Sequence, residues 1–320
     1  MRLWSLIVIY LVSVFAATNA NATKLNVVTS VAPITNIVKN VLGNQGSVVG
    51  IVPEGVNSHT FEPAPSDAKT LRRADIIIMN GLHLELPTIE LANKVKRDAT
   101  PIVLLGDQTI TKKEWKFDFS FPKSSGHPNP HLWPNIALAK KYAVYTRDAL
   151  SAVDAGNKAI YHANTKAYLS KLDQLDDAIF TCVKTIPAKH RKLVTYHDSY
   201  AYFAPRYGME VIGAIQPADF SEPTPREVVR IIKQLRKEKV PAVFGSEVFE
   251  SKILKQIAKE SNAVFIDELA DDDLPGDVGD SNHTFIGMMA NNMRIMADAL
   301  GGDSHCADHV DVTNISAVQP

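Results

Sequence analysis

The chain has 320 residues, of which 45% are hydrophobic and 22% are charged, a composition that excludes disordered and collagen-like proteins. A chain of this length can build two hydrophobic cores of about 100–150 residues each. Its 34 Lys and Arg residues nearly balance its 35 Asp and Glu residues and no basic block occurs, so no nucleic-acid partner is expected.

The first 22 residues have the pattern of a secretory signal peptide. Arg2 supplies a positive charge, residues 3–17 are largely apolar, and the small residues Ala20 and Ala22 flank Asn21 at the end. We expect cleavage after Ala22 and export to the periplasm. A membrane anchor is the weaker interpretation, because the apolar stretch is shorter than the roughly 20 residues needed to cross a bilayer. The region contains no cysteine to which a lipid could be attached.

Residues 23–134 are predicted to form an N-terminal α/β lobe. Apolar runs of strand length alternate there with helix-like segments, at residues 24–30, 47–53, 74–81 and 101–106. Continuous β-branched runs between helices are typical of a parallel sheet that is covered on both faces.

Residues 135–185 show no strand pattern. From Asn157 onwards, apolar residues recur near helical spacing for about seven turns without Gly or Pro. We therefore predict a helical segment that includes one long, rigid linker helix.

Residues 186–320 are predicted to form a C-terminal α/β lobe and a tail. Strand-like runs recur at residues 192–197, 209–215, 241–246 and 263–269. The expected fold is α/β, with two (β/α)4 lobes whose parallel sheets are joined by one long rigid helix, an architecture typical of binding proteins.

Four polar residues lie beyond the ends of predicted strands, where ligands bind to open parallel sheets. His59, His131, His197 and Asp271 would meet if the lobes faced each other. Three imidazole nitrogens and one carboxylate suit Zn²⁺, and a bidentate carboxylate would also admit Mn²⁺ or Fe²⁺. Each histidine taken alone could instead cap a helix or hydrogen-bond a loop carbonyl, so the prediction depends on their joint placement.

The two cysteines, Cys182 and Cys306, are too few for a disulfide-stapled scaffold. In an oxidising compartment they could pair, which would tie the end of a helix to the C-terminal tail. Two separate thiols remain an equal alternative.

Several motifs carry a family resemblance. They are N-S-H-T-F-E-P at 57–63, N-P-H-L-W-P-N at 129–135, T-Y-H-D-S-Y at 195–200, G-S-E at 245–247 and D-D-D-L at 271–274. In this order, the chain from about Leu25 to about Leu300 resembles the zinc- and manganese-binding solute-binding proteins of ABC transporters, the cluster A-I or TroA-like family.

The resemblance implies two lobes bridged by a long helix, with the metal buried between them. The family's two leading histidines fall on His59 and His131, and its third ligand, histidine or glutamate, falls on His197. The family aspartate falls on Asp271, with Asp272 and Asp273 beside it. A further family glutamate falls on Glu247, which we interpret as orienting a ligand imidazole from behind.

The implied function is capture of a divalent metal outside the cytoplasmic membrane and delivery to an ABC permease, by a monomer without enzymatic activity. Many zinc-specific members carry a long His-rich loop before the second histidine, whereas the loop here has only His127. Histidine at position 197 favours zinc, since members with glutamate there tend to bind manganese. We expect Zn²⁺, with Mn²⁺ or Fe²⁺ as the alternative.

Two other functions fit the sequence less well. A periplasmic zinc hydrolase would need an open metal position and a general base, for which Glu247 or Asp198 could serve, but the chain lacks H-E-x-x-H and a fourth protein ligand would close the site. An adhesin role is supported by no particular feature of the sequence.

Overall fold

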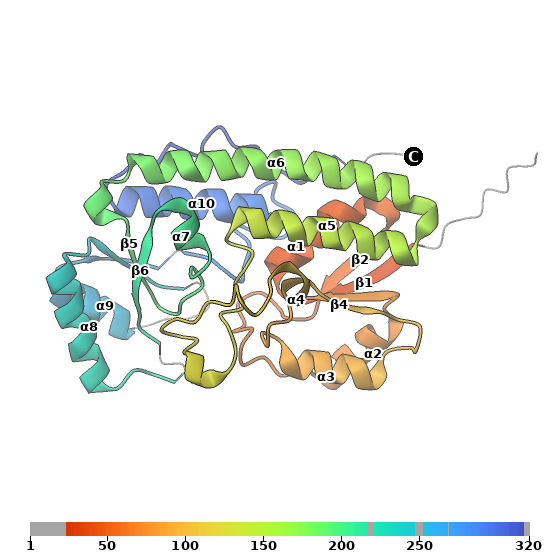
Figure 1. The fold of residues 1–320 in the computed structure, drawn as a ribbon, viewed down its shortest axis with the longest axis horizontal. Coiled ribbons are helices and arrows are strands. Elements are labelled where there is room, and N and C mark those ends of the chain that lie inside the picture. Colours follow the sequence, from red (N-terminus) through yellow and green to blue (C-terminus); the bar gives the residue numbers. More distant parts are fainter. Residues whose placement is uncertain (1–23, 217–220, 247–251, 268, 317–320) are drawn as a thin grey trace, which may run out of the picture.

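Two parallel sheets organise the chain, in a computed structural model that describes residues 24–216, 221–246, 252–267 and 269–316. Each sheet has four strands and its own helices, and one long helix runs along both lobes (Figure 1). The predicted signal peptide and Glu247 lie outside the described residues. The predicted α/β class with two parallel four-stranded sheets is confirmed.

The first sheet has the strand order β2-β1-β3-β4, and every neighbouring pair is parallel. Its strands are β1 (Leu25–Thr29), β2 (Gly46–Gly50), β3 (Ile76–Met79) and β4 (Ile102–Leu104). Its helices are α1 (Ala32–Leu42), α2 (Pro65–Arg73), α3 (Leu86–Val95) and α4 (Leu105–Thr109). All four side chains of β3 are buried, as expected of a strand covered on both faces.

The second sheet repeats this arrangement, with the order β6-β5-β7-β8 and parallel pairing throughout. Its strands are β5 (Lys192–Thr195), β6 (Glu210–Ala214), β7 (Ala242–Phe244) and β8 (Val264–Ile266). Its helices are α7 (Phe203–Tyr207), α8 (Pro225–Glu238) and α9 (Lys252–Ser261). Because all strands of each sheet are parallel, the loops that follow them gather at one edge of that sheet.

The lobes are joined by α5 (Ile136–Val153) and α6 (Lys158–Thr185). The 28 residues of α6 extend over about 42 Å and run along both lobes in Figure 1. Its buried face packs Tyr161, Tyr168, Leu172 and Leu175 into the core. The long helix that was predicted from residue 157 onwards is therefore present, and its packing along the whole length makes it a stiff connector.

The last helix, α10 (Phe285–Ala299), begins beside the first lobe, where the Phe285 N–H donates to Asn36 Oδ1 of α1. It ends in the second lobe, where the Leu300 carbonyl lies 3.1 Å from His190 Nδ1. It packs against α6 and also contacts α1. After it, Cys306 forms a disulfide with Cys182 near the end of α6, which settles the question that the sequence left open.

The tail beyond the disulfide reaches α1. The side-chain oxygen of Asn314 accepts hydrogen bonds from Asn36 Nδ2 at 3.0 Å and Asn40 Nδ2 at 2.7 Å, and the Ile315 N–H donates to Asn40 Oδ1. The segment that begins in the second lobe therefore ends on the first. No helix within the described ranges has both the length and the apolar character needed to span a membrane.

Candidate metal centre

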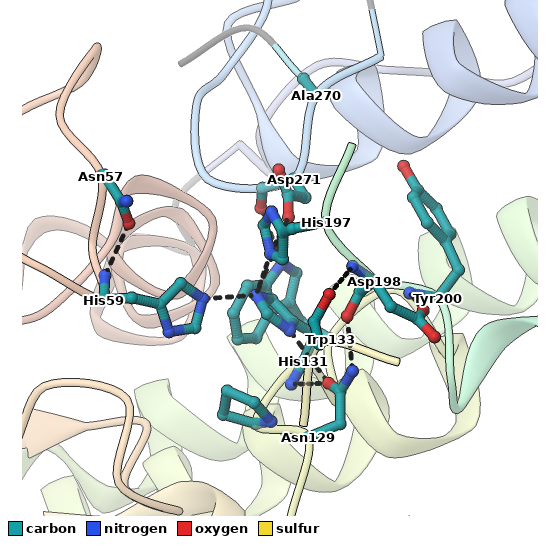
Figure 2. A network of polar contacts seen from close by, with 12 residues as sticks. Asn57, His59, Asn129, His131, Trp133, His197, Asp198, Tyr200, Ala270 and Asp271 are labelled. Atoms are coloured by element: carbon teal, nitrogen blue, oxygen red, sulfur yellow. Dashed lines mark hydrogen bonds and ion pairs between the residues drawn. The ribbon is translucent and has the colours of Figure 1, made fainter. Parts of the chain in front are cut away.

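The four predicted ligands come from loops at the carboxyl ends of four strands. His59 follows β2 and His131 follows β4 in the first lobe, while His197 follows β5 and Asp271 follows β8 in the second. Figure 2 shows their side chains pointing toward one another from separate segments. The structure thus brings together all four residues that the sequence singled out for this role.

His131 lies at the middle of the group. Its Nε2 atom is 3.3 Å from His59 Nε2 and 3.2 Å from His197 Nε2. The Oδ2 atom of Asp271 is 3.4 Å from His197 Nε2 and 3.8 Å from His131 Nε2. Ligand atoms bound at 2.0–2.1 Å around a tetrahedral ion are about 3.3–3.4 Å apart, and three of these four contacts are close to that spacing.

The centre is shielded from solvent. His131 is fully buried, His197 and Asp271 are at least 95% buried, and His59 is half-buried. Phe121 lies against it, with its ring centroid 5.3 Å from that of His59 and 5.7 Å from that of His131. An apolar wall of this kind excludes water and strengthens electrostatic interactions inside.

Burial keeps the three imidazoles neutral. It lowers the pKa of His59 and of His131 well below 6.5, and neighbouring imidazoles lower both further. Burial also lowers the pKa of His197 to about 4. Neutral imidazole is the form that binds metal ions, so at neutral pH no proton has to leave these rings before a cation enters.

Trp133 connects the loops that carry His131 and Asp271. Its ring lies against the imidazole of His131, with centroids 5.0 Å apart, and its indole Nε1 donates to the Asp271 carbonyl oxygen at 2.8 Å. Asn292 of α10 fixes the preceding residue, since its side chain accepts from Ala270 N–H and donates to the Ala270 carbonyl. The loop at Asp271 is therefore held through its backbone groups, by Trp133 at Asp271 and by Asn292 at Ala270.

The three consecutive aspartates have different surroundings. Asp271 presents the carboxylate that is nearest to the imidazoles. Asp272 is also buried and has a carboxylate oxygen within 4.8 Å of the ligand atoms of His131 and Asp271. Asp273 turns to the first lobe, where its Oδ2 accepts from Gly55 N–H at 2.7 Å.

Asp198, the residue after His197, is engaged in its own turn. Its Oδ1 accepts from Tyr200 N–H at 3.0 Å, and its backbone N–H donates to Ser120 Oγ at 3.0 Å. Burial, followed by the charge of Asp118, raises the pKa of Asp198 to about 7. These contacts give Asp198 a role in shaping the loop behind His197.

Sequence reasoning missed Asn129 and Trp133 as parts of the centre, although both lie within the motif around His131. Asn129 hydrogen-bonds His131 and is visible in Figure 2 below it. Asn before Pro favours a turn, and a tryptophan is usually interpreted as a core residue. The only signal for Asn129 and Trp133 is that each lies two residues from the histidine.

Other histidines lie elsewhere. His83 and His127 are exposed and stack with ring centroids 3.7 Å apart, and the exposed His305 pairs with Asp308. Among the described residues, the two groups of three or more potential metal ligands both belong to the centre around His131.

Comparisons with known proteins agree with this geometry. A family profile described as "Zinc-uptake complex component A periplasmic" matches residues 27–299. The metal ABC transporter substrate-binding lipoprotein FimA of Streptococcus parasanguinis is 29% identical over 282 residues, which are 87% of this chain and 89% of that protein. The manganese ABC transporter substrate-binding lipoprotein PsaA of Streptococcus pneumoniae is 29% identical over 303 residues, covering 89% of this chain and 91% of that protein.

Solved structures show the same fold. The periplasmic zinc-binding protein TroA of Treponema pallidum superposes with a TM-score of 0.77 and 27% identity, covering 87% of this chain and 99% of that one. A cadmium-bound periplasmic metal-binding protein from Candidatus Liberibacter asiaticus superposes with a TM-score of 0.74 and 25% identity, covering 86% of this chain and 98% of that one.

Proposed function

The chain belongs to the family of periplasmic zinc-uptake components, and we propose that the metal ion it carries is bound by His59, His131, His197 and Asp271. As a member of this family it is the solute-binding component of a metal ABC importer and not an enzyme. The observation that carries the ligand assignment is the convergence of three Nε2 atoms, with contacts of 3.2 and 3.3 Å, on a buried carboxylate.

The cargo that we propose is Zn²⁺. Three neutral imidazoles and one carboxylate are a common zinc ligand set, and their spacing fits bonds of 2.0–2.1 Å. Relatives differ in the metal that their names state, since PsaA is named for manganese and TroA for zinc. Mn²⁺ or Fe²⁺ is the alternative cargo, which would require a larger coordination number than four.

The partner that we propose is the membrane permease of the importer, which receives the ion from a monomeric binding protein. Several relatives are named lipoproteins. The first 23 residues here contain no cysteine, so we propose export to the periplasm with cleavage after Ala22 and no lipid at that site. The division into lobes 23–134 and 186–320, with a helical segment 135–185 between them, remains a prediction.

The ligand assignment is tested by titrating the metal-free protein with Zn²⁺ in a calorimeter. The double variant His59→Ala/His197→Ala should lose at least 1000-fold in affinity, because two of four ligands are gone. A matched control is His83→Ala/His127→Ala, which removes two exposed histidines outside the centre and should bind as the wild type does. Equal affinity of the wild type and the first variant would overturn the assignment.

The metal is tested by analysing protein purified from its native compartment, together with X-ray absorption at the bound metal's edge. Zinc with four nitrogen or oxygen neighbours is the expected result. Manganese or iron with five or six neighbours would replace zinc as the cargo and would leave the ligand assignment intact.

A further inference from the structure

Asn129 contacts His131 twice. Its side-chain oxygen Oδ1 lies 2.9 Å from the His131 backbone nitrogen and 2.9 Å from the ring atom Nδ1. Both residues are fully buried, so water does not compete for these contacts. One amide oxygen therefore faces the main chain and the ring of the same histidine.

The surroundings decide which end of the amide faces the histidine. Its Nδ2 atom lies 2.5 Å from the backbone carbonyl of Asp198 and 2.8 Å from Oδ2 of Asp118. A flipped amide would set Oδ1 against the Asp198 carbonyl oxygen and the NH₂ group against the His131 N–H, which would break both contacts. The oxygen must therefore face His131.

An amide oxygen can only accept hydrogen bonds, so the ring atom opposite it must carry a proton. A neutral imidazole has a single N–H, and with that proton on Nδ1 the lone pair is on Nε2. Nε2 is the atom that faces His59 and His197. The other tautomer would direct an N–H into the group of imidazoles and set two lone pairs against each other at Asn129.

Asn129 is itself held from three sides. Its backbone N–H donates to the Lys116 carbonyl at 2.9 Å. Asp118, which accepts from its Nδ2, also accepts from the backbone N–H groups of Ser120 and Phe121 through Oδ1. These bonds hold the loop that precedes His131 against the side chain of Asn129. The side-chain amide cannot rotate without losing several hydrogen bonds.

We infer that Asn129 is a positioning residue that commits His131 to the Nδ1–H tautomer and presents Nε2 to the cargo ion. Asn129 also donates to the carbonyl of Asp198, the residue after His197. This bond fixes the position of the His131 ring relative to the loop that carries His197. The role in metal binding rests on the proposed ligand set, whereas the tautomer of His131 is a property of the metal-free protein. Partners behind a ligand imidazole commonly change metal affinity 10- to 100-fold.

The test is nitrogen-15 NMR of metal-free protein with labelled histidine, at pH 7.5. Wild-type His131 should show a protonated Nδ1 and an unprotonated Nε2. Asn129→Leu, which has a similar size and no acceptor, should yield a mixture of tautomers and bind Zn²⁺ about 10- to 100-fold more weakly. A protonated Nε2 in the wild type, or an unchanged tautomer in Asn129→Leu, would overturn the inference.

Asn129→Ala covers the case in which the leucine variant fails to fold. It removes the acceptor opposite Nδ1 and places no bulky or charged group against the Asp198 carbonyl or the Asp118 carboxylate, so the Nδ1 proton resonance should move from its wild-type position. An unmoved proton resonance would mean that Nδ1 does not bond residue 129.

The matched control is Asn292→Leu. Asn292 is another buried amide at the centre, and it bonds the backbone of Ala270 instead of an imidazole. This variant should lose stability without altering the tautomer of His131. A wild type with the expected tautomer that did not bind Zn²⁺ would count against the proposed function and not against the role of Asn129.

Discussion

The indole nitrogen of Trp133 donates a hydrogen bond of 2.8 Å to the main-chain oxygen of Asp271, a residue 138 positions further along the chain. Both residues are buried, and each lies on a loop that carries a proposed ligand. The bond joins the end of one lobe's sheet to the end of the other's, so the carboxylate is positioned from the side on which His131 lies.

Trp133→Phe should weaken this arrangement. Phenylalanine keeps most of the ring packing but has no N–H, which leaves the buried Asp271 carbonyl without this donor. Loss of one partner of a buried hydrogen bond costs about 1–3 kcal/mol in unfolding free energy. We expect that loss in urea unfolding of metal-free protein, and about tenfold weaker Zn²⁺ binding by titration. Trp115→Phe, at a partly exposed tryptophan beside Lys112, is the control that should change neither quantity by a similar amount.

Glu85 should make the stability of the metal-free protein depend on pH. Its carboxylate accepts from the backbone N–H groups of Asn80 at 2.6 Å and Gly81 at 3.2 Å, yet burial outweighs these bonds and raises its pKa from 4.5 to about 7. The folded protein therefore holds a proton that the unfolded chain releases between about pH 4.5 and 7. The stabilisation is complete below pH 4.5 and is lost as the pH rises through 7, by an amount of order 3 kcal/mol.

Glu85→Gln should remove that dependence, because glutamine does not titrate. The neutral imidazoles of the metal centre have the opposite dependence, so the measured quantity is the difference between the variant and the wild type. Urea unfolding at pH 5 and pH 7.5 should show the wild type losing stability relative to the variant at the higher pH. A constant difference between the two proteins would contradict the raised pKa.

Glu54 should slow the release of the metal. Its Oε1 atom accepts from Leu274 N–H at 3.2 Å and lies 3.6 Å from His283 Nε2, across the gap between the loops that carry His59 and Asp271. Loss of one such hydrogen bond is worth about 0.5–1.5 kcal/mol. Glu54→Ala should therefore release Zn²⁺ about 2- to 10-fold faster in stopped-flow competition with a chelator. Glu62→Ala, at an exposed glutamate in the same connection, should release at the wild-type rate, and identical rates for all three proteins would refute the interlobe role.

The disulfide should support the fold without affecting the metal. It joins residues 124 positions apart at the end of α6, and removing a native disulfide typically costs 2–5 kcal/mol. Cys182→Ser/Cys306→Ser should lower the unfolding free energy by about that amount while Zn²⁺ affinity stays within about twofold. A large loss of affinity at a temperature where the variant is folded would show that the disulfide also positions the centre.

All eight strands were predictable from apolar runs. The inner strands β1, β3, β5 and β7 are mostly buried, whereas the edge strands β2, β4, β6 and β8 are partly exposed but keep the same kinds of apolar residue. The run Ile76–Met79 contains only apolar side chains, and all four are buried. The predicted ends were too long by one to three residues, as at 101–106, where the strand ends at Leu104 and a short helix follows. A pattern of hydrophobicity does not distinguish the last residue of a strand from the first residue of the next buried turn.

The convergence of His59, His131, His197 and Asp271 was predictable for a different reason. Parallel sheets place loops at one edge, so polar residues after strands are candidates irrespective of their distance in the chain. The contacts that orient the set were not, because an amide that bonds an imidazole and a tryptophan that bonds a carbonyl 138 residues away leave no periodic pattern. The pairing of Cys182 with Cys306 was likewise undecided, since spacing alone does not tell a disulfide from two thiols.

The return of the tail to α1 means that both ends of the described chain lie on the first lobe. Leu25 is in β1, and Ile315 bonds Asn40 of α1. A dye or surface linker attached at either end would therefore report on, or immobilise, the same half of the molecule. A fluorescence-transfer measurement of ion capture needs its second label inside the chain. One such position is the half-exposed Val229 on α8, a helix at the far side of the other lobe in Figure 1.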